Sequence, residues 1–453
     1  MRDHMRELSQ NDPIGSGIVD TFVNNIIGYG VMAQARTGTE AKDTALESYW
    51  IGRKNRLFQA DDLTQGEGQR MLLRGLIESG EIFVKAVYGL SEPVWFEIIE
   101  ADRVDTPAVK AADGNIRSGI ERDADGRIVA YWINGHHPGD IRAVKSKSVD
   151  NFTRVEAGFV RHLVIRERPG QSRGVPLGHA TIQDLRDLDL LLVASLKRTQ
   201  IAACLSAFIE SADNPENIFQ LTADKYGYEM DETIQPGMIY HTYPGEKLQS
   251  FIPNFPTPEL VPFVILLCRR IGAAFGVSWQ VVLKDFGDST YSSARTDLLE
   301  TRMTYKVLQR LFAERWLDWQ WRAVMKDGLL RGELAGVTDG DTYAVQWIPP
   351  GWEWVDPEKE ALAETIKLEN HLTTLQEVCA SRGKDWEEIL LQRLKEEKRE
   401  MELRASLGLP EKNPEPDEET ATQRMIRIAT SKQGEEEEIS NTNGNGRKHH
   451  ARN

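Results

Sequence analysis

The spacing of apolar positions predicts two helices in the first 80 residues of the chain. Over residues 11–35, apolar side chains recur every three or four positions, which places them on one helical face. Asp12 can cap the start of this helix, Pro13 suits its first turn, and Gly28 can end it. The same spacing predicts a second helix over residues 69–79.

The period of the pattern changes to two near residue 81, which predicts strands. Runs rich in β-branched and aromatic residues are separated by turn residues, and they read EIFVKAVYG, VWFEIIEADRV and IVAYWING. Asp125 and Gly126 supply a tight turn between two alternating arms, which predicts a hairpin. We therefore expect a sheet-bearing region over about residues 81–166.

A long apolar stripe predicts one helix over residues 177–210. Leu185, Leu192 and Leu196 mark one face, and further leucines extend the apolar character around the helix. At 1.5 Å per residue, this helix would be on the order of 50 Å long. Because so long and apolar a helix exceeds what a compact core needs, we expect it to pack against neighbours along its length.

The segments after this helix alternate between turn-rich and helical patterns. Residues 211–257 are rich in Pro, Asn and Gly and predict a small module, from which a helix over 258–275 returns. The clearest amphipathic pattern covers residues 292–326. Six of the eleven tryptophans fall between residues 316 and 354, and we interpret this cluster as packing because each indole buries a large area.

The C-terminal part of the chain changes from a helical pattern to a polar, acidic one. The Asp-Pro-Glu sequence at 356–358 is a good helix start, and we predict helices over 357–381 and 385–407 with a break at Gly383. The last residues, 411–453, have little to bury and many like charges, so they are predicted to be disordered.

Length and charge limit the classes of function. A chain of 453 residues suggests two or three folded units, and a hydrophobic content of 40% is that of folded soluble domains. There are 55 Lys and Arg residues against 70 Asp and Glu residues, which leaves a net charge of -15. That balance argues against a protein that grips nucleic acid tightly, because neutralising phosphates requires a basic surface.

The sequence does not predict a membrane protein or a secreted one. Its longest apolar run, residues 261–268, is far shorter than the roughly 20 residues that a membrane span requires. The charged N-terminus lacks the apolar segment of a secretory signal, so synthesis and assembly are expected in the cytosol. Cys204, Cys268 and Cys379 lie far apart, which is typical of reduced thiols.

One string matches a catalytic motif. Gly170–Gly174 (GQSRG) fits the G-x-S-x-G pattern of serine hydrolases, in which Ser172 would be the nucleophile. A Val-Pro pair follows where the first helical turn should donate N–H groups, so the context is poor.

The acids that could hold a metal ion are spread around the long helix: Asp184, Asp187 and Asp189. We expect no cofactor, no metal site and no catalytic residue.

Ten strings in order resemble the lambda-type portal proteins of tailed bacteriophages. Each string alone is weak, and their collinear set, spanning residues 2 to 410, is specific. They are RDHMRELSQND, NNIIGYGV, EIIEADRV, SGIERDADGRIVAYWI, HPGD, RERPGQSRGVP, FGVSW, YSSARTDLLETR, IPPGWEWVDPEKEALA and LGLP. Family members commonly carry a longer segment before the first string, so a scaffold-binding or protease-processed leader is not expected here.

The resemblance implies an α+β portal-type fold assembled as a ring, usually a dodecamer, at one vertex of the capsid. Double-stranded DNA passes through the channel without sequence preference, inward during packaging and outward at ejection. The large terminase docks outside and supplies the ATP hydrolysis, and head-completion or adaptor proteins, the major capsid protein and the scaffold protein are the other expected partners. The protein itself would be no enzyme; it would be assembled in the host cytoplasm and end in the virion.

The resemblance also divides the chain into the parts of a portal subunit. These are an N-terminal wing part (1–179), the first stem helix (180–208), the clip (209–257), the second stem helix (258–276), the channel loop (277–292), a C-terminal wing part with a long helix (293–355), the crown (356–410) and the tail (411–453).

Two sets of residues are candidates for function within this scheme. Lys284 with its neighbour Asp285, and Lys247, are candidates for contact with DNA in the channel. The candidates for packing between stem helices of neighbouring subunits are Leu185, Leu192, Leu196, Val264 and Leu267.

Two alternatives stay open beside the portal interpretation. One is a serine hydrolase that uses Ser172, and the other is a structural adaptor that assembles without passing DNA. For a DNA conduit the net charge of -15 has a use, because a strongly basic wall would trap the duplex. The channel face is therefore predicted to be mainly acidic with sparse lysines.

Overall fold

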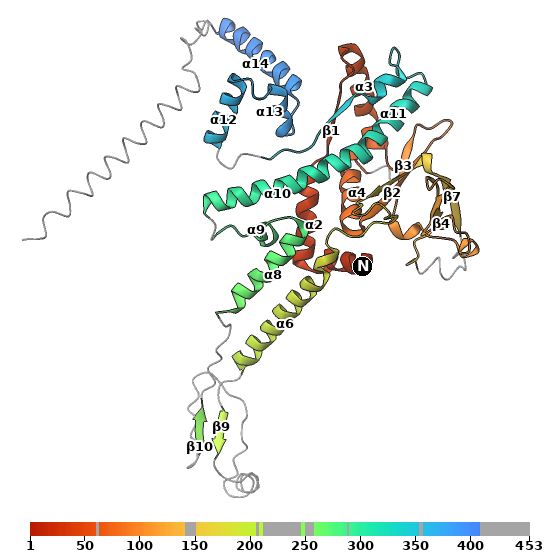
Figure 1. Cartoon of the computed structure of the whole chain (residues 1–453). Coiled ribbons are helices and arrows are strands. Elements are labelled where there is room, and N and C mark those ends of the chain that lie inside the picture. The colour runs from red at the N-terminus through yellow and green to blue at the C-terminus, as the bar shows by residue number, and fades with distance from the viewer. Residues whose placement is uncertain are drawn as a thin grey trace, which may run out of the picture. The chain divides into compact units, whose positions relative to one another are not determined.

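The structure, a computed structural model, describes most of the chain (Figure 1). The described residues are 1–59, 63–140, 151–204, 208–211, 246–249, 258–287, 290–352 and 357–407. They belong to two compact units, each made of segments far apart in the sequence. The first unit comprises Met1–Ile18 and Leu177–Ser289, and the second comprises Val19–Pro176 and Thr290–Asn453. Helices and antiparallel sheets are both present, so the predicted α+β class is confirmed.

Two antiparallel sheets form the basis of the second unit. The three-stranded sheet has the order β3 (Trp95–Ile99), β2 (Glu81–Val87), β8 (Val160–Val164). The four-stranded sheet has the order β4 (Ile116–Arg117), β5 (Ile120–Arg122), β6 (Ile128–Asn134), β7 (Phe152–Glu156). The predicted hairpin is confirmed, with Gly126 in its turn at a φ of 80°.

The sheet-bearing region contains two sheets because β8 pairs with β2 and not with the preceding strand β7. The sheets share one apolar core, in which Phe83 and Tyr131 meet edge to face with ring centroids 5.5 Å apart. The buried residues of this core are Phe83, Ile99, Ala101, Val104, Ile120, Tyr131, Ile133 and Val160. Alternate residues of each strand face this core, which is the physical origin of the period of two.

Seven α-helices of the described residues lie wholly within the second unit. They are α3 (Glu40–Arg53), α4 (Gln65–Ser79), α10 (Tyr291–Phe312), α11 (Asp318–Leu330), α12 (Pro357–Glu369), α13 (Leu375–Ser381) and α14 (Trp386–Ser406). Short 3₁₀ turns lie at Lys54–Arg56, Ala101–Arg103, Ala108–Lys110, Ala157–Phe159 and Asp339–Tyr343.

The first predicted helix is shorter than expected. Helix α2 (Pro13–Ile26) ends before residue 35, because Gly28 takes a φ of 54° that no continuing helix allows. Strand β1 (Met32–Ala35) then pairs with β11 (Val345–Ile348), a contact across more than 300 residues that local pattern does not reveal. The start is as predicted: the Asp12 carboxylate accepts the N–H of Gly15 at 2.5 Å.

The strongest amphipathic pattern forms one nearly continuous helical rod. Helices α10 and α11 are joined by a π-helical turn, Ala313–Leu317. The wider turn shifts the position of the apolar stripe around the helix axis. Trp316 and Leu317 within the turn are buried. The interpretation of the tryptophan cluster as packing is confirmed, since Trp321 lies 5.2 Å from Trp50 and 6.1 Å from Trp347 between ring centroids. Trp354 lies outside the described residues.

The predicted helix over 357–381 is two helices. It breaks after Glu369, where His371 takes a left-handed φ of 57° and Thr374 begins α13 with a reciprocal capping box. The predicted break at Gly383 is confirmed, with a φ of 71°. The tail, 411–453, lies outside the described residues.

Helices dominate the described part of the first unit. Its elements are α1 (Arg2–Asn11), a 3₁₀ turn at His179–Thr181, α6 (Ile182–Cys204), β9 (Phe208–Ser211), β10 (Glu246–Gln249), α8 (Leu260–Phe275) and α9 (Trp279–Leu283). Helix α1, which the pattern did not predict, packs on α6, and Arg186 donates to Glu7 at 2.9 Å.

Helix α6 is shorter than the helix predicted over 177–210. Its 23 residues span about 35 Å at 1.5 Å per residue. The residues before Ile182 form a tight 3₁₀ turn closed by the N–H of Thr181 on the carbonyl of Gly178. At the far end, Phe208 begins strand β9, which pairs with β10, so cross-strand pairing replaces helix there.

Gly80 allows a test of the close approach between α4 and the loop at Val175. Gly80 has a φ of 77°, and a Cβ there would lie 2.2 Å from the Val175 carbonyl. A left-handed φ alone costs other residues roughly 1–2 kcal/mol, and overpacking adds to it. We expect Gly80→Ala to lower the free energy of unfolding by about 3 kcal/mol, measured by urea denaturation.

Gly126→Ala is the matched control, because its φ of 80° is similar but nothing lies within 4 Å of the added Cβ. Equal losses in the two variants would contradict the proposed steric origin.

Candidate functional site

Helix α6 divides into a buried half and an exposed half. Leu185 and Leu188 are almost completely buried within the first unit. Further along the helix, Leu192 is 44% exposed and Leu196 is 59% exposed, and Leu190 and Val193 are exposed as well. Leu185, predicted as a contact between subunits, therefore packs within its own unit, whereas Leu192 and Leu196 remain accessible.

Helix α8 shows the same division. Cys268, Ile271 and Phe275 are buried near its C-terminal end, whereas the predicted packing residues Val264 and Leu267 are half-buried. Figure 1 shows α6 and α8 side by side, and Arg270 on α8 forms an ion pair with Asp184 on α6 at 3.1 Å.

The accessible apolar residues of the two helices are named the stem apolar surface. They are Leu190, Leu192, Val193, Leu196, Val261, Phe263 and Leu266. A concentration of exposed leucine, valine and phenylalanine on neighbouring helices marks an interaction surface.

A glycine permits the close packing at the base of these helices. A Cβ on Gly178 would lie 2.3 Å from the Phe275 ring and 2.9 Å from the Met5 side chain. Because only glycine leaves room there, α1, the entry to α6 and the end of α8 can share one apolar contact.

The predicted channel segment contains a short helix and a defined turn. Lys284 follows α9 with a left-handed φ of 55°, and the N–H of Asp285 donates to the carbonyl of Gln280 at 3.0 Å. The side chains of Lys284 and Asp285 are both exposed. Among the described residues no carboxylate pairs with Lys284, so its ammonium is available to an anion. Its neighbours Asp288 and Ser289 lie outside that part of the chain.

Lys247 lies on strand β10, where the register places it opposite Glu210 of β9. The rest of the predicted clip, residues 212–245 and 250–257, lies outside the described residues.

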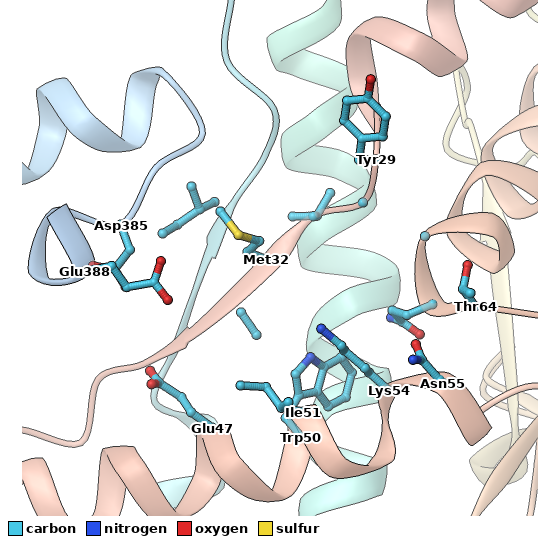
Figure 2. Close-up of a pocket in the computed structure, with 16 residues that line it drawn as sticks. Tyr29, Met32, Glu47, Trp50, Ile51, Lys54, Asn55, Thr64, Asp385 and Glu388 are labelled. Carbon is cyan, nitrogen blue, oxygen red and sulfur yellow. The ribbon is translucent and has the colours of Figure 1, made fainter. Parts of the chain in front are cut away.

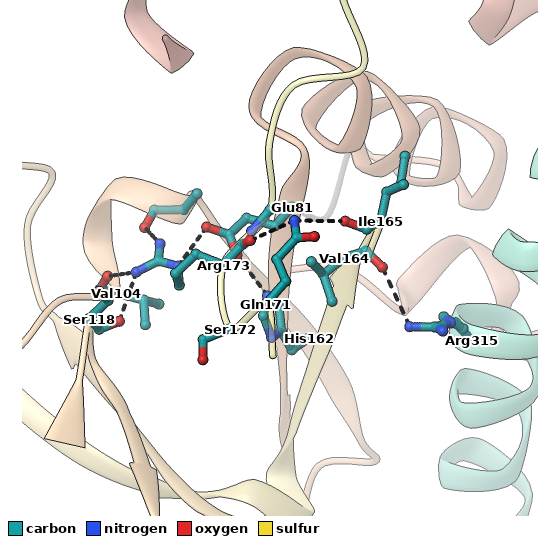
Figure 3. Close-up of polar contacts among 12 residues, drawn as sticks. Glu81, Val104, Ser118, His162, Val164, Ile165, Gln171, Ser172, Arg173 and Arg315 are labelled. Carbon is teal, nitrogen blue, oxygen red and sulfur yellow. Dashed lines mark hydrogen bonds and ion pairs between the residues drawn. The ribbon is translucent and has the colours of Figure 1, made fainter. Parts of the chain in front are cut away.

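The string GQSRG forms a loop pinned by a buried ion pair (Figure 3). Arg173 donates to Glu81 at 2.6 Å and also to the carbonyls of Ala101, Val104 and Ser118. Glu81 is fully buried and accepts two further hydrogen bonds, from His162 at 2.8 Å and from the N–H of Gly174 at 2.8 Å.

This loop does not have the geometry of a nucleophile elbow. Strand β8 ends at Val164, and the next helix of the chain, α6, begins only at Ile182. Ser172 accepts a hydrogen bond from Arg122 at 3.3 Å, with no histidine as a general base beside it in the described contacts. The loop therefore lacks the strand-turn-helix context that this motif requires, and its contacts are those of a structural loop.

The buried cluster determines which of its groups carry charge. Burial alone would raise the pKa of Glu81, but the hydrogen bond from His162 and the charge of Arg173 outweigh it and hold that pKa below its ordinary value. Burial lowers the pKa of His162 despite the contact with Glu81. Glu81 is therefore a carboxylate at neutral pH, and His162 is a neutral imidazole that donates through Nε2.

A cavity of about 370 Å³ lies in the second unit, and its lining includes Asp385 and Glu388 (Figure 2). Its acids are engaged by structural contacts: Glu47 accepts the N–H of Ala35, and Asp385 accepts from Gln34. No histidine, serine or cysteine is among the described residues that line this cavity.

Across the part of the chain that the structure describes, no group of three His, Cys, Asp or Glu residues could hold a metal ion. Of the three acids considered from the sequence, Asp184 pairs with Arg270 and Asp187 accepts from Gln183.

Cys268 and Cys379 are buried free thiols. None of the described helices is long and apolar enough to cross a bilayer.

The chain belongs to the lambda family of phage portal proteins, since the sequence pattern described as "Phage portal protein, lambda family" matches residues 1–309. A probable portal protein of Halomonas phage phiHAP-1 is 28% identical over 325 residues, which cover 69% of this chain and 62% of that relative. Portal protein B of Escherichia phage lambda is 22% identical over 360 residues, covering 72% of this chain and 67% of that protein.

A solved structure shares the fold. One chain of the neck of an empty gene transfer agent particle, computed with C6 symmetry, superposes with a TM-score of 0.51 at 15% identity, covering 84% of this chain and 93% of that one. The resemblance first noted in ten short strings is thus confirmed at the level of family and fold.

The buried cluster generates a prediction on pH. Below the ordinary histidine pKa of 6.5, the unfolded chain binds a proton at His162 that the folded chain does not. The stabilisation that comes from keeping His162 neutral is therefore fully present above pH 6.5. As the pH falls from 6.5 toward the lowered pKa, the free energy of unfolding decreases by up to about 1.4 kcal/mol per pH unit. His162→Gln, which can still donate to Glu81, should flatten this dependence between pH 6.5 and 5 in urea denaturation.

The exposed His136 provides the matched control, His136→Gln, which should keep the slope of the unaltered protein. An unchanged slope in His162→Gln would show that other groups cause the loss of stability in acid.

Proposed function

We propose that this chain is the portal subunit of a tailed phage, and that about twelve copies form a ring around a DNA channel at one capsid vertex. Its role is structural: the ring passes DNA inward during packaging and outward at ejection, and the terminase supplies the ATP hydrolysis. Membership of the portal family supports this proposal, together with the stem apolar surface.

The stem apolar surface is the observation that carries the assembly step. Each exposed leucine or phenylalanine that becomes buried gains roughly 1.5–3 kcal/mol, so burial of a stripe along two helices stabilises contact between copies. In a closed ring every subunit offers the same pair of surfaces to its neighbours, and no copy keeps an exposed stripe.

We infer for this subunit the same division into parts that the resemblance implies. In the proposed ring, α6 and α8 are the stem, the segment with β9 and β10 is the clip, and the segment with Lys284 is the channel loop. The two sheets with α10 and α11 form the wing, and α12 to α14 form the crown. Terminase, adaptor, capsid and scaffold proteins are the proposed partners of this ring in the host cytoplasm and the virion.

A charged residue within the stem apolar surface should prevent assembly. We expect Leu196→Lys to convert rings to monomers at micromolar concentration, because the ammonium would have to be desolvated in each contact. Sedimentation velocity and negative-stain images measure the outcome, with rings of about twelve lobes around a central hole for the unaltered protein.

Leu330→Lys is the control, because Leu330 is 87% exposed and lies on α11, which belongs to the second unit and is not one of the stem helices. A stable monomer of the unaltered chain would overturn the proposal, and closed discs without a hole would favour the structural adaptor.

Lys284 provides a test of DNA contact in the channel. Lys284→Asn removes the charge while keeping a residue type that tolerates the left-handed backbone at this position. We expect fewer packaged genomes per particle in a phage carrying this change, because the moving duplex loses a phosphate contact in each subunit. Lys284→Arg keeps the charge and should package normally, and unchanged packaging by Lys284→Asn would exclude the role.

A further inference from the structure

A cavity at the free edge of strand β8 is surrounded by positive charge. It has a volume of about 260 Å³, and its polar lining consists of Arg161, Arg166, Arg315, Tyr131 and His162. Three apolar residues complete the lining, and no acidic residue takes part. We name this cavity the arginine pocket.

Local structure explains how three arginines meet at this edge. Arg161 and Arg166 lie on β8 and just after it, and β8 is the edge strand of the sheet β3–β2–β8. Arg315 comes from the π-helical turn between α10 and α11, whose widened spacing is frequent at functional positions. All of these residues belong to the second unit, so the pocket is complete within it.

Main-chain contacts hold two of the guanidinium groups in place. Arg161 donates through Nε to the carbonyl of Arg315, and Arg315 donates to the carbonyl of Val164 at 3.4 Å (Figure 3). Each contact occupies one of the five N–H donors of a guanidinium, which leaves donors for a ligand. Within the described residues, none of the three arginines of the pocket forms an ion pair with a carboxylate.

The pocket therefore carries a positive charge that its own lining residues do not neutralise. Burial and the nearby charges of Arg315 and Arg322 lower the pKa of Arg161, against smaller opposing effects of Tyr131 and Asp318. Burial raises the pKa of Tyr131, which keeps its hydroxyl protonated and able to donate. A bound anion would relieve the mutual repulsion of the arginines.

We propose that the arginine pocket binds a phosphate-type oxyanion. A guanidinium group can donate two parallel hydrogen bonds to two oxygens of a phosphate. Three guanidinium groups around one cavity supply both positive charge and oriented hydrogen-bond donors. The cavity is smaller than the roughly 300–1,000 Å³ of sites for larger organic ligands, which suits a compact ion. Two ligands present this same oxyanion chemistry: free phosphate and the phosphodiester backbone of DNA.

Inorganic phosphate is the first probe. Calorimetry and ³¹P line widths of the full-length protein, titrated with potassium phosphate against potassium chloride of equal ionic strength, should show binding of phosphate alone. Arg166→Gln and Arg315→Gln should each weaken it about tenfold or more, because each removes charge-assisted hydrogen bonds. Arg161 is avoided as a target because its Nε donates to the carbonyl of Arg315, so a variant there would also disturb the backbone of a second pocket residue.

Arg310→Gln is the matched control, since Arg310 lies five positions before Arg315 on the same rod, is exposed, and pairs with Glu314 outside the pocket. Its phosphate affinity should equal that of the unaltered protein. Circular dichroism and the Tm in chloride check that all three variants are folded.

A short DNA duplex distinguishes the two sources. If the duplex displaces phosphate from the unaltered protein, and binds the double variant Arg166→Gln/Arg315→Gln more weakly than the unaltered protein, the backbone of DNA reaches the pocket. If phosphate binds and the duplex does not compete, free phosphate is the ligand, and both results support the site.

Three results would overturn the proposal: phosphate binding no stronger than chloride, variant affinities equal to that of the unaltered protein, or binding of a glutamate-rich peptide that phosphate cannot displace. None of these measurements depends on ring formation, so failure here is distinguishable from failure of the proposed function.

Discussion

The second unit depends on the buried ion pair between Glu81 and Arg173. Removing a carboxylate from water is costly, and Glu81 is stable at zero exposure only because Arg173, His162 and the N–H of Gly174 all bind it. Arg173 also donates to the carbonyls of Ala101, Val104 and Ser118, and it thereby links the start of β2 to the neighbouring segments. The loop that leads along the chain toward α6 is thereby attached to the sheets, although it has no regular secondary structure.

A second constraint is the uneven burial of the stem helices. Leu185, Leu188, Cys268 and Ile271 are buried, whereas Leu192, Leu196 and Val261 are 44%, 59% and 62% exposed in the described part of the chain. One helix thus serves two purposes along its length, as core near one end and as an assembly surface near the other. An apolar stripe longer than the subunit's own core is the physical signature of a protein whose final packing partners are other copies.

Much of the fold followed from local pattern. The strands β2, β3 and β6, the hairpin at Gly126, and the glycines Gly28 and Gly383 that end helices were predictable because period and turn chemistry act over a few residues. The pairing of β1 with β11 and the packing of α1 on α6 were not, because each joins segments distant in the chain. The position of the break between α12 and α13 depends on a left-handed residue, His371, that propensity does not favour.

The sequence by itself determined the class, the family and the apolar positions of the stem, because these are recorded in composition, order and period. Only the tertiary structure decided that Leu185 is core while Leu196 is exposed, since both have the same place in the helical repeat. It also turned GQSRG from a catalytic motif into a structural loop, and it brought Arg161, Arg166 and Arg315 around one cavity. Charges that are far apart along a chain acquire a shared function only when folding sets the distances between them, because electrostatic interaction depends on separation in space.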